Sequence, residues 1–169
     1  MTENIKKIII LGNREEKSEI LKICSEWELF FKKKKWETEA FFIEADVEQT
    51  LMKIAADERA NMVICFQLAG FHITMFGGDI FLNKFYCPIV NIIWKPLGER
   101  DLKLLDSRLN VTIVFFTNDR ENVDKVKQGL EFPPYIRYLP DFKKFWEEVN
   151  LKTVFLYGND MDVSGHGGQ

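Results

Sequence analysis

Two nearly continuous apolar runs, MVICF (residues 62–66) and PIVNIIW (residues 88–94), constrain the fold of this chain most strongly. Strands that are apolar at consecutive positions are typical of a parallel sheet whose two faces are both covered by helices. The loop between the runs, QLAGFHITMFGGD, leaves the carboxyl end of the first strand. Ligands bind at that end of the strands in open α/β sheets. The sequence therefore predicts an α/β protein and indicates where its binding site lies.

Size and charge limit the classes of protein that are possible. The chain has 169 residues, which fit one domain, and we expect residues 1–158 to form it. Residues 159–169 are rich in glycine and acids, and we expect a flexible tail. The formal charge of −3 argues against a nucleic-acid partner, which a basic surface would favour. No segment has the pattern of a signal peptide or the roughly 18 apolar residues of a membrane span, so we expect no membrane partner and a cytoplasmic location.

Three cysteines, Cys24, Cys65 and Cys87, lie far apart and inside or beside apolar runs. Their odd number and wide spacing indicate neither a disulfide framework nor a metal knuckle. We interpret them as small hydrophobic core residues, with reactive thiols as the alternative.

Strands and helices are expected to alternate along the whole chain. The expected strands are residues 5–11, 40–43, 62–66, 89–94, 111–116, 135–139 and 153–157. The expected helices are residues 14–31, 46–56, 80–86 and 99–107, a helix capped by Asn118 that ends near Gly129, and a helix that begins at Asp141.

This alternation predicts a three-layer α/β/α sandwich around a mostly parallel sheet, with Rossmann-like or flavodoxin-like winding. The strand order cannot be derived from one sequence. Residues 135–139 follow Pro133 and Pro134 and are expected to form an edge strand.

Several functions that such folds commonly have are excluded by missing residues. The turn LGNREEK after the first strand offers only Gly12, whereas a dinucleotide fingerprint needs several glycines. A phosphate-binding P-loop is absent. Receiver domains need acids at the ends of the first and third strands, where this chain has Asn13 and Gln67. We therefore expect no cofactor.

The loop after the third strand carries the remaining candidates for chemistry. His72 is either a general acid or base, or a partly buried histidine that donates to a backbone carbonyl, and we favour the second interpretation. Gly77 and Gly78 before Asp79 form either an anion-binding nest or a plain turn. Lys95 either meets an anion or is an exposed strand end. The candidate ligand contacts, all at expected strand ends or in the loops that follow them, are Gly12, Asn13, Gln67, His72, Gly77, Gly78, Asp79, Lys95, Thr117 and Asn118.

The same region resembles the N-terminal Rossmann-like domain of GT-B-type glycosyltransferases, including the spore-maturation-protein-like branch. The resemblance covers residues 5–118 and rests on the Gly12 turn, the long helix, MVICFQLAGF, CPIVNIIWKP and NVTIVFFTND. It implies a domain that shapes the acceptor side, while the sugar-nucleotide donor binds mainly to a second domain that has no counterpart here. We therefore expect an accessory domain that binds a small anionic or sugar-like ligand or a protein partner. The alternative is a subunit of a glycosyl-transfer enzyme that needs a separate donor-binding chain.

Two groups of aromatic residues either fill the core or form an interface with a second copy or another protein. The first group is Phe30, Phe31, Trp36, Phe41 and Phe42, and the second is Phe132, Tyr135, Tyr138, Phe142, Phe145 and Trp146.

Overall fold

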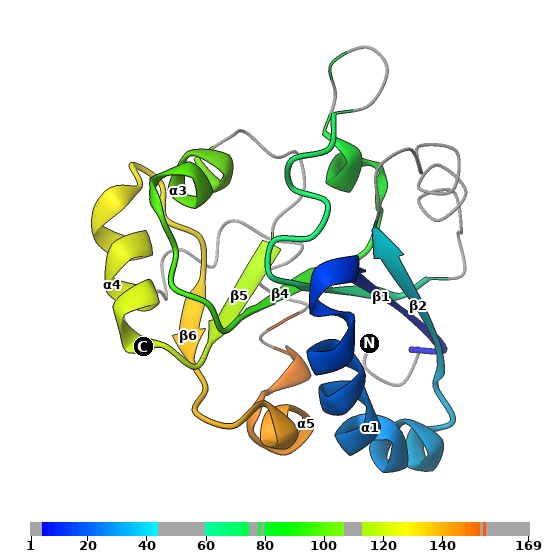
Figure 1. Cartoon of the computed structure of the whole chain (residues 1–169). Helices are drawn as coiled ribbons and strands as arrows, with labels where there is room; N and C mark the ends of the chain where they lie inside the picture. The colour runs from blue at the N-terminus through cyan, green and yellow to red at the C-terminus, as the bar shows by residue number, and fades with distance from the viewer. Residues whose placement is uncertain are drawn as a thin grey trace.

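A six-stranded parallel sheet forms the centre of the molecule (Figure 1). The computed structural model describes residues 5–43, 60–74, 78, 80–106, 113–152 and 154. The strands are β1 Lys7–Asn13, β2 Glu37–Ile43, β3 Met62–Phe66, β4 Ile89–Ile93, β5 Ile113–Thr117 and β6 Ile136–Tyr138. Every residue of β3, β4 and β5 is buried, as expected for strands covered on both faces.

The strand order is β2-β1-β3-β4-β5-β6, and every adjacent pair is parallel. The first five strands follow the flavodoxin-like order, which decides between the two windings that the sequence left open. β6 lies at the edge of the sheet, as predicted from Pro133 and Pro134. In this order the side of the sheet on which successive strands are added changes between β1 and β3, and the crevice of the fold opens beside their carboxyl ends.

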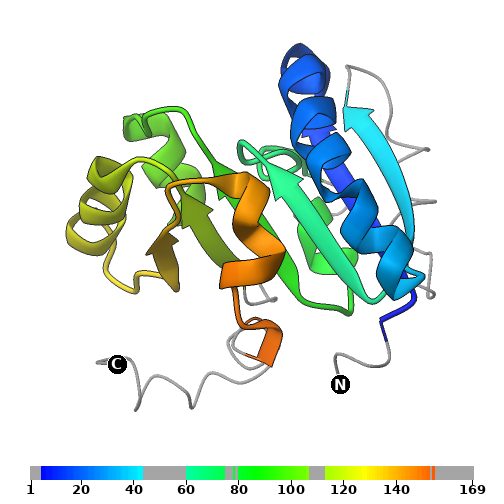
Figure 2. The same cartoon turned by 90° about the horizontal axis from the view of Figure 1, so that it is seen from below.

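Helices cover both faces of the sheet and complete the three predicted layers. They are η2 Arg14–Glu16, α1 Lys17–Lys34, η3 Phe81–Lys84, α3 Glu99–Leu105, α4 Arg120–Gly129, η4 Phe142–Lys144 and α5 Phe145–Glu148, where η marks a 3-10 helix. α1 and α5 lie side by side on one face (Figure 2). η3, α3 and α4 contribute to the cluster on the other face.

Many of the protein's aromatic rings pack on the face under α1 and α5. Trp27 is 1% exposed, and its ring packs against Phe31, Phe66, Phe145 and Trp146. Its Nε1 donates to the carbonyl of Phe142 at 2.8 Å, so α1 is fixed to the segment that begins η4. This confirms that the stripe of α1 that contains Trp27 faces the core.

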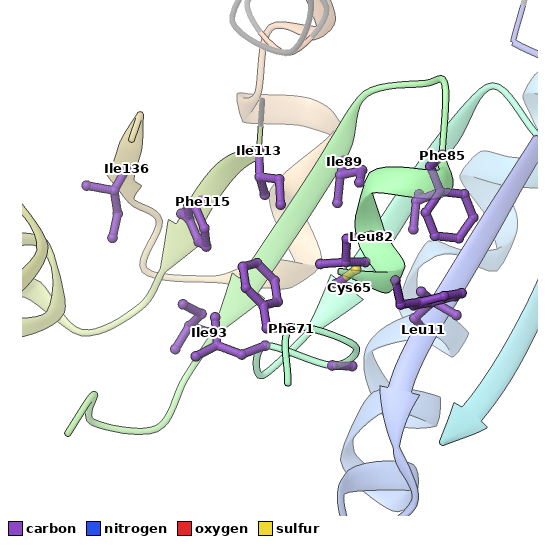
Figure 3. Packing of buried hydrophobic residues seen from close by; sticks show 14 of the residues in the cluster. Leu11, Cys65, Phe71, Leu82, Phe85, Ile89, Ile93, Ile113, Phe115 and Ile136 are labelled. Carbon is purple, nitrogen blue, oxygen red and sulfur yellow. The ribbon is translucent and has the colours of Figure 1, made fainter. Parts of the chain in front are cut away.

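The opposite face is mainly aliphatic. Alternate residues of the strands, such as Leu11, Ile89 and Ile93, belong there to one cluster with Leu82 and Phe85 of the η3 region (Figure 3). β3 and β4 supply residues to both clusters, one on each face of the sheet.

The two predicted aromatic groups largely join the core. Phe31, Phe142, Phe145 and Trp146 are buried, and Trp146 packs against both Phe30 and Trp36. Phe132 differs, because 83% of its surface is exposed.

Several details of the predicted elements are wrong; the predicted helix 80–86, for instance, is the 3-10 helix Phe81–Lys84. Asp119, rather than Asn118, caps α4, and its carboxylate accepts from the backbone N–H of Glu121 at 2.9 Å. Val154, inside the predicted strand 153–157, is helical, with its N–H directed to the carbonyl of Asn150. The predicted helix 46–56 and the predicted tail lie outside the described residues.

The cysteines are free, as expected from their spacing. Cys65 is buried, whereas Cys24 and Cys87 are partly buried. Burial raises the pKa of Cys24 to about 11 and that of Cys87 to about 12, so both thiols are protonated at neutral pH. Among the described helices, none combines the length and the apolar character needed to cross a bilayer.

Candidate functional site

An open cleft with a volume of about 1640 Å³ lies at the carboxyl edge of the sheet. The segments that line it follow three adjacent strands: residues 13–16 after β1, residues 67–74 after β3 and residues 95–101 after β4. This is the crevice beside the point where the strand order reverses. Its position agrees with the general location of ligands in open α/β sheets.

The turn after β1 places a glutamate inside this cleft. A Cβ atom on Gly12 would collide with Ile20 Cδ1, so glycine leaves room for the Ile20 side chain to pack against the strand. Asn13, the last residue of β1, directly precedes the short helix η2, and Glu16 is the last residue of η2. The sharp turn brings the Glu16 carboxyl group to the cleft rather than to solvent on the outer side of α1.

Glu16 is unusual in its burial: only 5% of its surface is exposed, although carboxyl groups normally lie on the protein surface. Its Oε1 lies 3.6 Å from Lys95 Nζ, whereas its Oε2 has no hydrogen-bond partner. Burial raises the pKa of Glu16, and the nearby Lys95 ammonium opposes that rise. A buried acceptor without a partner costs folding free energy, and a ligand that donates to it recovers that cost.

The loop after β3 is strained where it enters the cleft. Gln67 and Leu68 have φ angles of 52° and 58°, in the left-handed region that residues other than glycine rarely occupy. Two side chains hold this conformation through three hydrogen bonds. Gln67 Oε1 accepts from the backbone N–H groups of Trp94 and Lys95, and Asn91 Oδ1 accepts from the N–H of Leu68 at 3.4 Å. The ends of β3 and β4 are therefore tied together directly below the cleft.

Residues 95–97 are held from the other side by α4. Asn122 is fully buried; its Nδ2 donates to the Lys95 carbonyl at 3.0 Å, and its Oδ1 accepts from the Leu97 N–H at 2.9 Å. Lys125 Nζ donates to the Leu97 carbonyl at 3.0 Å. The backbone of Lys95 is thus fixed on two sides, while 53% of its side chain is exposed.

Four of the predicted contacts line the cleft: Asn13, Gln67, His72 and Lys95. His72 is exposed, so the expectation of a partly buried histidine is wrong. The reason is that the loop turns its neighbour Phe71 into the core instead.

The other predicted contacts have different roles or positions. Gly12 serves the packing of Ile20. Thr117 is buried, and its Oγ1 accepts from Asn122 Nδ2 and from the N–H of Asp119. Asn118 and Gly78 are exposed and do not line the cleft. Gly77 and Asp79 lie outside the described residues.

The sequence-based selection missed Glu16, Arg14 and Arg100, which all line the cleft. Arg14 and Glu16 follow the first strand by only one to three positions, and that closeness to a strand end was the available signal. Including Lys95, the lining has three cationic side chains against four acidic ones, Glu15, Glu16, Glu99 and Asp101. Asp101 already accepts from the Gly98 N–H at 2.8 Å. The lining is therefore polar and of mixed charge.

No group of three or more His, Cys, Asp or Glu side chains within the described ranges is arranged to hold a metal ion.

Scans of the chain against models of protein families, against curated proteins and against solved structures found no match. The resemblance to glycosyltransferases, and the alternative of a glycosyl-transfer subunit, therefore stay predictions.

Proposed function

We propose that this chain is a binding module for a small, sugar-like ligand that carries several hydroxyl groups. The observation that carries the proposal is the Glu16 carboxyl group: the residue lines the cleft, and its Oε2 is buried without a hydrogen-bond partner. An ionised carboxyl group accepts hydrogen bonds only, and a ligand hydroxyl is a suitable donor. Such charge-assisted hydrogen bonds are stronger than neutral ones.

The other cleft residues fit the same ligand class. Hydroxyl groups both donate and accept, and the lining offers acceptors and donors side by side, from Glu16 and Asn13 to Lys95. Four carboxylates line the cleft beside three cationic side chains, so this mixed charge does not favour a ligand that is a simple anion. The cleft volume of about 1640 Å³ is larger than an ordinary small-molecule pocket, so it has room for a monosaccharide or disaccharide.

Calorimetric titration of the purified chain with a panel of neutral monosaccharides and disaccharides tests the proposal. We expect at least one of them to bind, and we expect Glu16→Met to weaken that sugar about ten-fold or more, because the acceptor is lost while the side-chain size is kept. Glu19→Met is the matched control. Glu19 is exposed on α1 and does not line the cleft, so its replacement should leave the affinity unchanged.

Two results would count against the proposal. Absence of binding across the whole panel at millimolar concentrations removes the sugar-like ligand. Equal affinities of wild type and Glu16→Met for a sugar that does bind show that Glu16 is not the contact.

A further inference from the structure

We propose that the ligand of this cleft carries an anionic group in addition to its hydroxyl groups, and that Lys95 is the residue that selects for this anion. The inference rests on the proposed function and narrows its substrate class. Two different contacts then lie next to each other in the cleft: the Glu16 carboxyl group accepts from a ligand hydroxyl, and the Lys95 ammonium group binds a ligand oxyanion.

Both backbone polar groups of Lys95 are bound by side chains of other elements. Its N–H donates to Gln67 Oε1 at 3.1 Å, and its carbonyl accepts from Asn122 Nδ2 at 3.0 Å. The two partners belong to different elements, the loop after β3 and helix α4. A lysine that is fixed at the backbone and mobile only in its side chain presents its charge to a defined region of the cleft.

The Lys95 ammonium group is only loosely engaged by Glu16. The distance of 3.6 Å between Lys95 Nζ and Glu16 Oε1 is longer than the 2.7–2.9 Å of a good charge-assisted hydrogen bond. An ammonium group has three donors, and the exposed half of this side chain leaves room for a second acceptor. Lys95 can therefore contact a ligand oxyanion without leaving Glu16.

The pair also explains how an anion is tolerated in a cleft with several acids. A ligand that donates to Glu16 and offers an oxyanion to Lys95 keeps both charges of the pair partnered. An anion without hydroxyl groups contacts Lys95 but leaves Glu16 Oε2 without a donor. A neutral sugar satisfies Glu16 alone, so the combined ligand should bind most tightly.

Sugar phosphates and sugar carboxylates share this chemistry, and both belong in the test. Wild-type protein is titrated with glucose, glucose 6-phosphate, glucuronate and inorganic phosphate, and then with the corresponding members for any other sugar that the neutral panel identifies. We expect the phosphorylated or carboxylated sugar to bind about ten-fold or more tightly than its neutral parent. Inorganic phosphate should bind more weakly than the sugar phosphate.

Variants of Lys95 decide whether this residue is responsible. In Lys95→Met we expect the charged and the neutral sugar to bind equally, whereas Lys95→Arg should keep most of the preference for the charged one. Lys22→Met is the matched control, because Lys22 is exposed on α1 outside the cleft and its loss should leave the preference intact.

The possible failures can be told apart. If neutral sugars bind wild type and their charged derivatives bind no better, the proposed function stands and this inference fails. A preference that survives in Lys95→Met also overturns the role of Lys95. Inorganic phosphate that binds as tightly as the sugar phosphate indicates a plain anion site and overturns the combined ligand. If no member of the set binds, the proposed function fails, and this inference fails with it.

Discussion

The two faces of the sheet use the same strands for different purposes. Under α1 and α5, aromatic rings pack around Trp27, and its indole N–H has a backbone partner. On the opposite face, α4 supplies the fully buried amide of Asn122, whose hydrogen bonds extend to the wall of the cleft. The comparison indicates that the face under α1 and α5 mainly stabilises the fold. On the opposite face, buried polar groups also hold the wall of the cleft in place.

The largest effect is expected on the aromatic face. Trp27→Ala removes a buried ring that contacts four others, and it removes the side-chain donor to the Phe142 carbonyl, which keeps only the Phe145 N–H. We expect the free energy of unfolding to fall by about 3–5 kcal/mol, measured by urea denaturation. Leu29→Ala is the control, because Leu29 is 79% exposed on the same helix and should change stability by less than about 0.5 kcal/mol. Equal losses in the two variants would contradict the burial of Trp27 in the aromatic cluster under α1.

A smaller effect is expected from the polar network of the opposite face. Asn122→Ala leaves the Leu97 N–H and the Lys95 carbonyl without their partners, and we expect a loss of about 2–3 kcal/mol. Gln128→Ala removes an amide side chain from an exposed position of the same helix and should be nearly neutral. If both variants unfold at the same urea concentration, the hydrogen bonds of Asn122 do not hold the 95–97 segment.

The strands of the sheet could be predicted because their signal is local. Residues 62–66 were predicted with the correct bounds, since burial on both faces produces a continuous apolar run. β2 was predicted from residue 40 onward but begins at Glu37. Its first residues, including Glu37 and Glu39, are exposed at the sheet edge and carry no apolar signal.

The cleft could be predicted only where it depends on strand ends. Gln67 and Lys95 were found because the carboxyl ends of parallel strands meet at one edge of the sheet. Glu16 was missed, because an acid at the start of a helix normally faces solvent and complements the helix dipole. Its burial depends on the short turn η2 and on the loop after β4, which are far apart in sequence. Asn122 was missed for a similar reason, since its partners lie 25 and 27 residues away.

The smallest expected effect concerns the pH dependence of stability and tests the state of Glu16 without any ligand. Burial raises the pKa of Glu16 in the folded protein above its ordinary value of 4.5. The folded state therefore holds the Glu16 proton more tightly than the unfolded state does. The stability that this proton contributes is fully present below pH 4.5 and is lost as the pH rises through the folded pKa.

Glu16→Gln removes this titration while keeping the size of the side chain. We expect the variant to gain stability relative to wild type as the pH rises from 4 to 7, because the wild type must then ionise a buried carboxyl group. Differences that do not depend on pH, such as a changed hydrogen bond of the amide, cancel when the two pH values are compared. Urea denaturation at pH 4, 5, 6 and 7 measures the difference, and Glu19→Gln on the exposed side of α1 should show no such trend.

A constant difference between wild type and Glu16→Gln would mean that the Lys95 ammonium fully offsets the burial of the carboxyl group. Glu16 would then be an ordinary ion-pair partner, and the unpartnered Oε2 would lose its value as the mark of a binding site.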